Sequence, residues 1–315
     1  MEDKKETFLL IDGNAILYRA FYALPPLTTK KGEIINAVYG FLLVLFKVIK
    51  EFRPKFLAVT FDFPAPTFRE KIFKEYKAQR PKMPEDLTSQ IPHLKKILKS
   101  FGIKIYEKEG YEADDLIGSI AEIIKKEKKN IEVIIVTGDL DVLQLVNASV
   151  KVYLLKRGIK ETTIYDKNLV KEKLGILPRQ VPDFKALFGD PSDNIPGVLG
   201  IGKKTASLLL EKFKNLEELY KGLERGTDKI PQSIKKNLLK GREKVFFSRE
   251  LILINKDALK RQEFSFEECN FKNLNQKKGG EIMKSYGFLS LVKRLPEVLN
   301  KETSNKRQSI QQSLI

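Results

Sequence analysis

Residues 133–141 read Val-Ile-Ile-Val-Thr-Gly-Asp-Leu-Asp, a β-branched run that ends in a glycine and two aspartates. Consecutive β-branched residues are typical of a parallel strand that is buried on both faces. The Gly-Asp step that follows is a turn signal. The stretch therefore predicts a core strand whose carboxyl end carries Asp139 and Asp141.

The same pattern occurs twice upstream. Residues 8–11, Phe-Leu-Leu-Ile, end at Asp12, and residues 56–61, Phe-Leu-Ala-Val-Thr-Phe, end at Asp62. Helical patterns lie between the strands, over about 36–52, 86–101 and 112–126. Alternating strands and helices predict an α/β doubly wound sheet. Because ligands of such sheets bind beyond the carboxyl ends of the strands, we expect the aspartates at one functional edge.

From about residue 180 the pattern becomes mostly helical. Residues 189–197, Gly-Asp-Pro-Ser-Asp-Asn-Ile-Pro-Gly, are rich in turn formers, and a Gly-Ile-Gly step leads into a helical stretch over 203–213. The last residues are polar and predict a disordered tail. We expect three parts: an α/β domain over 1–175, a helical subdomain over 176–298 and a disordered tail over 299–315.

The composition indicates what the chain binds. It has 58 Lys and Arg against 41 Asp and Glu in 315 residues, a net charge of +17, which favours a polyanionic partner. A single cysteine, Cys269, excludes an internal disulfide and a cysteine-rich metal site. A single histidine, His93, excludes the usual histidine-based zinc catalysis. Any metal site must therefore consist of oxygen ligands, which favours Mg²⁺ or Mn²⁺.

No apolar run approaches the roughly 20 residues that a membrane span needs. The longest, residues 41–46, ends at Lys47, and the first residues, Met-Glu-Asp-Lys-Lys-Glu-Thr-Phe, lack the apolar centre of a signal peptide. We therefore expect a cytoplasmic protein without a membrane partner.

Nine carboxylates gather in five tight clusters of this basic chain. A single aspartate at a strand end often caps the next helix. Many like charges at one edge, however, raise each other's pKa and destabilise the fold unless cations neutralise them. Two Mg²⁺ ions about 3.5–4 Å apart would do so, and would also activate water and stabilise a phosphoryl transition state. The nine are Asp12, Asp62, Glu112, Asp114, Asp115, Asp139, Asp141, Asp190 and Asp193.

Four blocks make the sequence recognisable: Ile11–Gly13, Gly110–Asp115, Thr137–Asp141 and Gly189–Gly197. They resemble the signature blocks of the 5′→3′ exonuclease domain of bacterial DNA polymerase I, in the flap endonuclease superfamily. The resemblance covers nearly the whole chain. It implies a PIN-like or resolvase-like parallel sheet flanked by helices with a helical arch. It also implies a metal-dependent, structure-specific nuclease of replication and repair. Such an enzyme cuts 5′ flaps, 5′ ends and RNA primers, and leaves a 5′-phosphate.

The resemblance also implies roles for the acids. The first metal would be served by Asp12, Asp62 and Asp114. The second would be served by Asp139, Asp141 and Asp193. Ligands or holders of bound water would be Glu112, Asp115 and Asp190. The metal would be Mg²⁺, with Mn²⁺ as a substitute.

Residues 68–85 are basic and aromatic, which is typical of a solvated helix that ends before Pro81. By resemblance they form the family's arch, along which the 5′ strand passes. Lys77 and Arg80 would then contact the scissile phosphate region, Arg19 and Arg69 would bind further phosphates, and Tyr76 would stack on an unpaired base. The chain departs from the common pattern at Glu70, where many relatives have His, and at Leu140, where many have Lys.

A glycine hairpin precedes the predicted helix at 203–213. A lone Gly-x-Gly is usually only a turn, but here it opens a helix N-terminus, where free amides favour phosphate. The stretch resembles a helix-hairpin-helix element, called helix-three-turn-helix in this family, which binds duplex backbone without reading sequence. A K⁺ ion on the hairpin carbonyls is implied as well. The expected DNA-binding residues are Gly200, Gly202, Lys203, Lys204 and Thr205.

Two other functions compete with this one. A PIN-type ribonuclease has a similar acidic site, but small RNA-cutting relatives generally lack the arch and the hairpin. A junction-binding protein without catalysis would have lost ligands, yet all nine carboxylates are present. A DNA polymerase could act in trans on the products of a monomeric nuclease. Residues 311–315, Gln-Gln-Ser-Leu-Ile, are loosely similar to the bacterial sliding-clamp peptide, although a random polar tail is the simpler interpretation.

Overall fold

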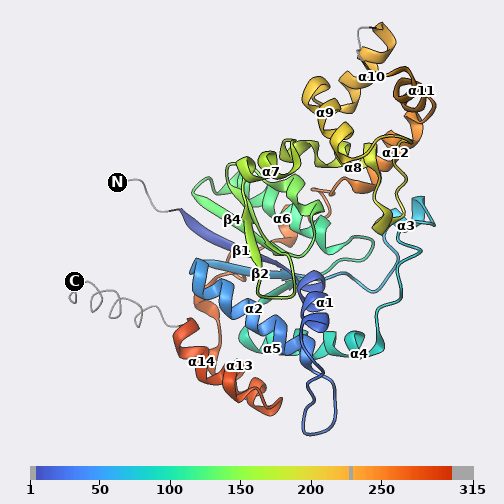
Figure 1. The fold of residues 1–315 in the computed structure, drawn as a ribbon. Coiled ribbons are helices and arrows are strands. Elements are labelled where there is room, and N and C mark those ends of the chain that lie inside the picture. The colour runs from blue at the N-terminus through green and yellow to red at the C-terminus, as the bar shows by residue number, and fades with distance from the viewer. Residues whose placement is uncertain (1–4, 227–229, 300–315) are drawn as a thin grey trace, which may run out of the picture.

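The computed structural model describes residues 5–226 and 230–299. Within them six strands form one sheet in the order β3-β2-β1-β4-β5-β6, with helices on both faces (Figure 1). All neighbours pair in parallel except β5 and β6. The strands are β1 (Glu6–Asp12), β2 (Phe56–Thr60), β3 (Lys104–Tyr106), β4 (Ile131–Thr137), β5 (Val150–Leu155) and β6 (Thr162–Tyr165). The predicted α/β fold class is confirmed.

The helices in the described residues alternate with the strands and then continue alone. They are α1 (Gly13–Ala23), α2 (Asn36–Phe52), α3 (Phe68–Ile72), α4 (Glu85–Thr88), α5 (Gln90–Phe101), α6 (Ala113–Glu127), α7 (Lys167–Leu174), α8 (Val181–Phe188), α9 (Lys203–Phe213), α10 (Leu216–Arg225), α11 (Gln232–Lys240), α12 (Arg242–Ile252), α13 (Gln276–Ser285) and α14 (Leu289–Leu299). No helix in this part of the chain is long and apolar enough to cross a membrane.

Alternating side chains of β1 enter two cores, one on each face of the sheet. Phe8 and Leu10 belong to the core that also contains residues of α6, whereas Leu9 and Ile11 belong to the core that contains residues of α1, α2 and α5. All four side chains are buried. Because both faces of the strand are buried, its sequence is a continuous apolar run, and this is why such runs predicted strands.

Three strands were not predicted from the sequence. The short β3 has only three residues, β5 alternates lysine and tyrosine with valine, and β6 is an antiparallel edge strand with partly exposed threonines. The helix predicted over 86–101 is interrupted at Ser89, between α4 and α5. Pro92 accounts for the interruption, because a proline cannot donate to the carbonyl four residues earlier.

The segment expected to form a helical arch, residues 68–85, is helical only over α3 and the start of α4. Thr67 and Glu70 form a capping box at the start of α3. Glu70, which departs from the family pattern, thus has a structural role here. Beyond α3, the prolines at positions 81 and 84 prevent a continuous helix.

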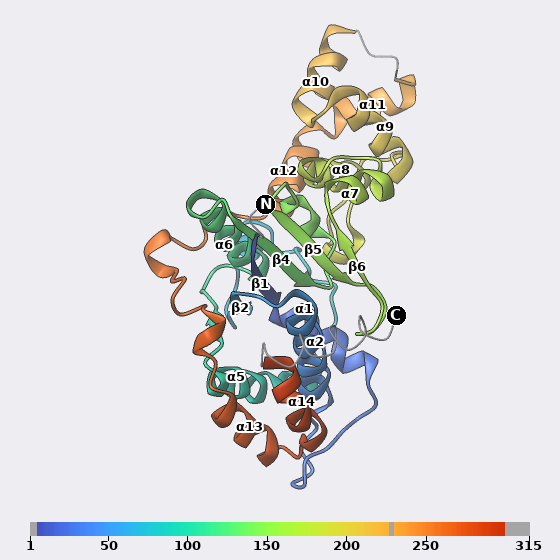
Figure 2. The same ribbon diagram turned by 90° about the vertical axis from the view of Figure 1, so that its left-hand side faces the viewer.

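The subdomain expected over 176–298 is not one unit in space. Helices α8–α12 lie together beyond the carboxyl edge of the sheet, but the chain then returns to the α/β domain (Figures 1 and 2). The amide of Leu57 donates to the carbonyl of Cys269 at 2.8 Å, and the amide of Asn275 donates to the carbonyl of Phe101 at 2.8 Å. Helices α13 and α14 consequently lie beside α5 and α2. The tail and clamp peptide expected within 300–315 lie outside the described residues.

Candidate metal centre and nucleic-acid cleft

The strand register brings the predicted aspartates to one edge of the sheet. In β1, Ile11 pairs with Val136 of β4, and Asp12 pairs with Thr60 of β2. A cleft of about 1380 Å³ opens at this edge. Five of the nine carboxylates line it: Asp12, Asp62, Glu112, Asp114 and Asp139. Its basic lining residues are Arg19, Lys77, Arg80, Arg157 and Lys160.

Asp12 caps a helix and also lines the cleft. One carboxylate oxygen accepts the amide of Ala15 at 2.9 Å and so caps α1, and the other accepts the hydroxyl of Thr137 at 2.7 Å. Burial raises the pKa of Asp12 to about 7, against the lowering effect of these hydrogen bonds and with further raising by Asp62 and Asp139. A divalent cation would offset this cost.

Asp114 lies in the first turn of α6 and shares the cleft with Asp12. Burial and then the charges of Asp12, Asp139 and Glu112 raise the pKa of Asp114 well above its ordinary value. Asp62, two residues after β2, accepts the amide of Ala113 at 2.7 Å and so orients the start of α6. The carboxylates that line the cleft therefore raise one another's pKa.

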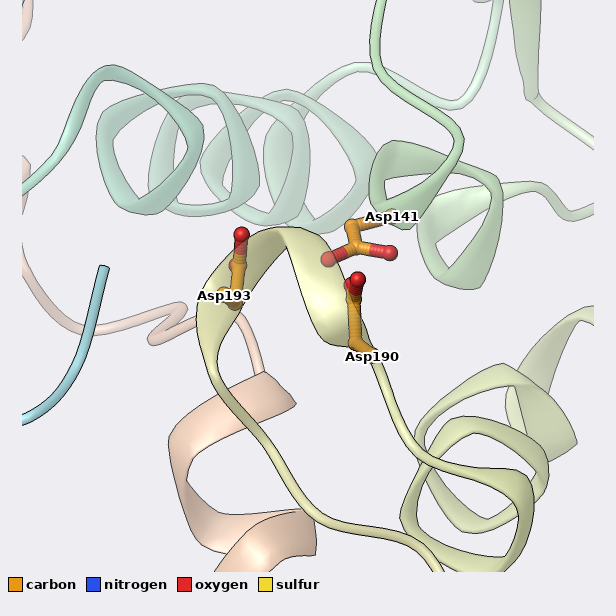
Figure 3. Close-up of side chains that lie close together, drawn as sticks. All are labelled: Asp141, Asp190 and Asp193. Atoms are coloured by element: carbon orange, nitrogen blue, oxygen red, sulfur yellow. The ribbon is translucent and has the colours of Figure 1, made fainter. Parts of the chain in front are cut away.

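A second group, the acidic triad, consists of Asp141, Asp190 and Asp193, whose side chains lie close together (Figure 3). Pro191 and Ser192, between the last two, line the cleft. One oxygen of each carboxylate lies within 4.8 Å of the others, and no other group of three acids, histidines or cysteines in the described residues is this close. Asp141 begins the 3₁₀ turn after β4. Asp190 caps the 3₁₀ turn over Pro191–Asp193, and Asp193 is its last residue. Three oxygen donors at this spacing fit a hard divalent cation.

Protein cations already contact the triad. The ammonium of Lys185 pairs with Asp141 and, at 2.5 Å, with Asp190, and the guanidinium of Arg80 pairs with Asp193. Burial raises the pKa of Asp141 to about 7, with Asp139 raising it further and Lys185 opposing. Burial also acts to raise the pKa of Asp190, but the contacts with Lys185 and Ser192 lower it overall.

The structure places Asp115 and Arg69 inside the protein, paired with each other. Asp115 is fully buried, and its two oxygens accept the Arg69 guanidinium at 2.7 and 2.8 Å and the amides of Glu112 and Asn255. Arg69 is equally buried and also donates to the carbonyl of Leu251 at 2.7 Å. Neither residue lines the cleft, because the pair joins α3, α6 and the end of α12.

Tyr76, which was expected to stack on an unpaired base, is buried in this structure. Its side chain is 4% exposed and packs in the core that contains α6, so it presents no face on which a base could stack. Its hydroxyl lies 3.4 Å from both Glu112 and Asp193. Next to it, Lys77 has a left-handed backbone, with φ of 56°, and its ammonium contacts Glu112 at 2.6 Å. The basic segment is therefore docked onto the acids by its own cations.

Arg19 lines the cleft and supports the turn after β4. Its guanidinium donates to the carbonyl of Gly138 at 2.8 Å and to the carbonyl of Lys156. A Cβ at Gly138 would lie too close to the Arg19 Nε, so a larger residue there would require the Arg19 side chain to move. In the same turn Leu140 is about half exposed, so its departure from the family pattern disturbs no packing.

The glycine hairpin lies directly before α9. Gly200 has φ of +82°, a conformation that favours glycine, and Gly202 occupies the N-cap position without a side-chain hydrogen bond. Lys203, Lys204 and Thr205 form the first turn of α9, with both lysines exposed. The side-chain amide of Asn237 donates to the carbonyl of Leu199 at 2.9 Å and so fixes the hairpin against α11. The helix amides are accordingly available to a phosphate.

Several residues of the cleft, and one cation at the acidic triad, were not identified from the sequence. Lys185 lies five positions before Asp190. Tyr18 and Tyr22 are an exposed i, i+4 pair on α1, with ring centroids 4.9 Å apart. Arg157 and Lys160 line the cleft from the segment after β5. The spacing of the tyrosines was a usable signal, since such pairs share a helix face. The three cations had no signal that separated them from the many other lysines and arginines.

Comparison with known proteins identifies this arrangement. Residues 7–175 match the model of the 5′-3′ exonuclease N-terminal resolvase-like domain, and residues 176–277 match that of the 5′-3′ exonuclease C-terminal SAM fold. The chain belongs to the 5′-3′ exonuclease family. The predicted family, fold class and nuclease activity are thereby confirmed.

Two curated relatives place the chain within this family. It is 45% identical over 233 residues to a 5′-3′ exonuclease of Aquifex aeolicus, covering 74% of this chain and 78% of the relative. It is also 42% identical over 306 residues to DNA polymerase I of Caldicellulosiruptor bescii, covering 96% of this chain and 35% of the polymerase. The chain thus spans about a third of the length of the polymerases it matches.

Solved structures share the fold at low sequence identity. T5 5′-exonuclease with bound zinc ions has a TM-score of 0.65 at 20% identity, covering 93% of this chain and 98% of that one. The catalytic core of Rad2 in complex with DNA substrate has a TM-score of 0.55 at 14% identity, covering 94% and 91%. At these identities the likeness supports the fold.

Proposed function

We propose that this 5′-3′ exonuclease family member hydrolyses phosphodiesters at 5′ flaps, 5′ ends and RNA primers on DNA, with two Mg²⁺ ions held by the acids of the cleft and the triad. The observation that carries the proposal is a single cleft lined by five of the nine carboxylates and by five basic side chains. Relatives named for 5′-3′ exonuclease activity, and solved relatives with divalent metals or DNA substrate, support it. Mn²⁺ would substitute for Mg²⁺.

The carboxylates divide into two ligand sets in this proposal. Asp12, Asp62 and Asp114 would hold one ion, with Asp139 between the sets, and the acidic triad would hold the other. Bound there, the ions would activate water and stabilise the leaving oxygen. Glu112, which lines the cleft beside Lys77, would hold water or complete a ligand set. Asp115 keeps the structural role that its pairing with Arg69 gives it.

The basic residues would place the phosphodiester. Lys77 and Arg80 now pair with Glu112 and Asp193 through side chains that are 26% and 45% exposed, so a phosphate can compete for them. They would orient the scissile phosphate and offset charge that develops on it. Arg19, which lines the cleft from α1, would bind a further phosphate. The route of the strand would thus pass between the arch segment, residues 68–85, and α1.

The hairpin before α9 would hold the duplex. Its free helix amides and the exposed ammonium groups of Lys203 and Lys204 face solvent, which suits phosphate binding without base contacts. A K⁺ ion on the hairpin carbonyls belongs to this proposal. We also propose that the protein is monomeric and cytoplasmic. A DNA polymerase would act in trans on its products, and residues 311–315 would contact a sliding clamp.

A cleavage assay tests the proposal. A labelled 5′-flap DNA is incubated with the protein in Mg²⁺, in EDTA, and in Mg²⁺ with the Asp114→Asn/Asp139→Asn variant. We expect cleavage in the first sample and in a control variant, Asp257→Asn, whose exposed carboxylate lies outside the cleft. Equal cleavage in all samples would reject the metal mechanism. Tight binding without any cleavage by the wild type would favour a junction-binding protein.

A further inference from the structure

Lys185 differs from the other cations near the acids in that it binds two carboxylates of the acidic triad at once. Its ammonium pairs with Asp141 and, at 2.5 Å, with Asp190. The side chain is 16% exposed, and it leaves the last turn of α8. It is therefore directed into the triad by a packed helix.

Arg80, the second cation at the triad, is held less firmly. It pairs with Asp193, its side chain is 45% exposed, and it comes from the largely non-helical arch segment. Movement of that segment would remove Arg80 from the acids. Lys185 cannot leave in this way, because Phe184, Ala186 and Leu187 anchor α8 in the core. Only rotation of its own side chain can free the carboxylates.

The other half of the acidic set has no such cation. In the described residues no lysine or arginine forms an ion pair with Asp12, Asp62 or Asp114. An ion that binds there displaces no ammonium or guanidinium from these three carboxylates, because Lys77, whose charge acts on Asp62 and Asp114, is paired with Glu112 instead. An ion that binds the triad meets an ammonium that uses the same oxygens, and cations a few ångströms apart repel each other strongly in a partly buried site.

We propose that Lys185 is a built-in competitor for the divalent cation at the triad, so that the two metal positions differ in affinity. This inference rests on the proposed metal function. Binding at the triad requires the ammonium to leave Asp141 and Asp190, whereas binding at Asp12 and Asp114 does not. The phosphates of bound DNA add negative charge beside the triad and offset the ammonium, so the triad fills with its ion chiefly once substrate is present.

A Mn²⁺ titration of the DNA-free protein, with free Mn²⁺ measured by electron paramagnetic resonance, tests the inference. Lys185→Met removes the charge and keeps the stem. The matched control is Lys129→Met, in the exposed turn before β4 at the opposite edge of the sheet. We expect a tight and a weak class of Mn²⁺ in the wild type. In Lys185→Met the weak class tightens on the order of tenfold, while the tight class and the control stay unchanged.

Unchanged or weaker binding of the weak class in Lys185→Met would overturn the inference. Circular dichroism checks that Lys185→Met is folded. If Lys185→Met does not fold, Lys185→Gln takes its place, and the same tightening of the weak class is expected. Lys185→Arg keeps the positive charge and should keep the wild-type affinity for Mn²⁺. Asp141→Asn should abolish the weak class. If it does not, the metal assignment of the proposed function fails. If it does and Lys185→Met still changes nothing, only the role of Lys185 fails.

Discussion

The guanidinium of Arg69 binds both carboxylate oxygens of Asp115, at 2.7 and 2.8 Å, inside the protein rather than in the cleft. The pair joins α3, at the base of the arch segment, to α6, which carries Asp114. We infer that it sets the distance between the basic segment and the acids, and so acts on catalysis through the fold.

Removal of one member of this pair should destabilise the protein strongly. Arg69→Met leaves a buried carboxylate unpaired, which costs about 3–5 kcal/mol, whereas Arg69→Met/Asp115→Leu should cost less than Arg69→Met alone because it leaves no charge behind. Urea unfolding measures both. As a control, Lys50→Met breaks the half-exposed pair with Glu297 and should cost no more than about 1 kcal/mol. If Arg69→Met unfolds at the same urea concentration as the wild type, the structural role of the Arg69–Asp115 pair is refuted.

Metal-free protein should lose stability as the pH rises from about 4 to about 7. The pKa of Asp12 and of Asp141 is raised to about 7 in the folded state from an ordinary 3.8. The folded state therefore binds more protons than the unfolded state in this window, and the stabilisation present below pH 4 is lost as the pH passes the folded pKa. Unfolding by urea at several pH values measures the slope.

Asp12→Asn or Asp141→Asn should flatten that slope, and each should reduce the loss of stability across the window by up to about 4 kcal/mol. Mg²⁺ should reverse it, because metal ligands bind as carboxylates and metal affinity rises with deprotonation. A stability that rises with pH in EDTA, in wild type and variants alike, would show that these carboxylates are not destabilised by burial.

The hairpin should supply sequence-independent affinity. Lys203→Ala/Lys204→Ala should weaken duplex binding equally for unrelated sequences and lower the slope of log affinity against log salt by about 0.9 for each lost phosphate contact. Lys277→Ala/Lys278→Ala, two exposed adjacent lysines in the first turn of α13, is the matched control. Fluorescence anisotropy at several salt concentrations measures both. Equal losses in the two variants would indicate a general charge effect.

Lys77 and Arg80 should act on cleavage more than on binding. Lys77→Met or Arg80→Met should lower the single-turnover rate on a 5′-flap DNA about 10²-fold or more. Lys74→Met, an exposed lysine in the same segment, should leave the rate within about twofold. If all three variants lose rate together, the segment contributes only net charge. Tyr76→Phe should keep the rate, since the buried ring packs rather than stacks on a base.

The sequence predicted those features that depend on local pattern. β1, β2 and β4 are buried on both faces, so their apolar runs and terminal aspartates were visible, and the parallel register then brought Asp12 beside Thr137. The acids were predicted as a set for the same reason. Helices α2 and α9 were located because their apolar periodicity and boundaries are clear.

Features that depend on distant partners were not predictable. The Arg69–Asp115 pair joins residues 46 positions apart, and no local pattern distinguishes it from a phosphate contact. The burial of Tyr76 depends on the core that contains α6, and the return of α13 to α5 depends on contacts made after Cys269. Lys185 was one lysine among many until α8 placed it against Asp141.

Anomalous scattering from a crystal soaked in Mn²⁺ with a 5′-flap DNA tests the central claim most directly. The account predicts two Mn²⁺ peaks at the carboxyl edge of the sheet, one bound by Asp12 and Asp114 and one by Asp141 and Asp193. It also predicts a DNA phosphate near both peaks and no Mn²⁺ on Asp115. The absence of a peak within coordination distance of these carboxylates, with DNA present in the cleft, would contradict it.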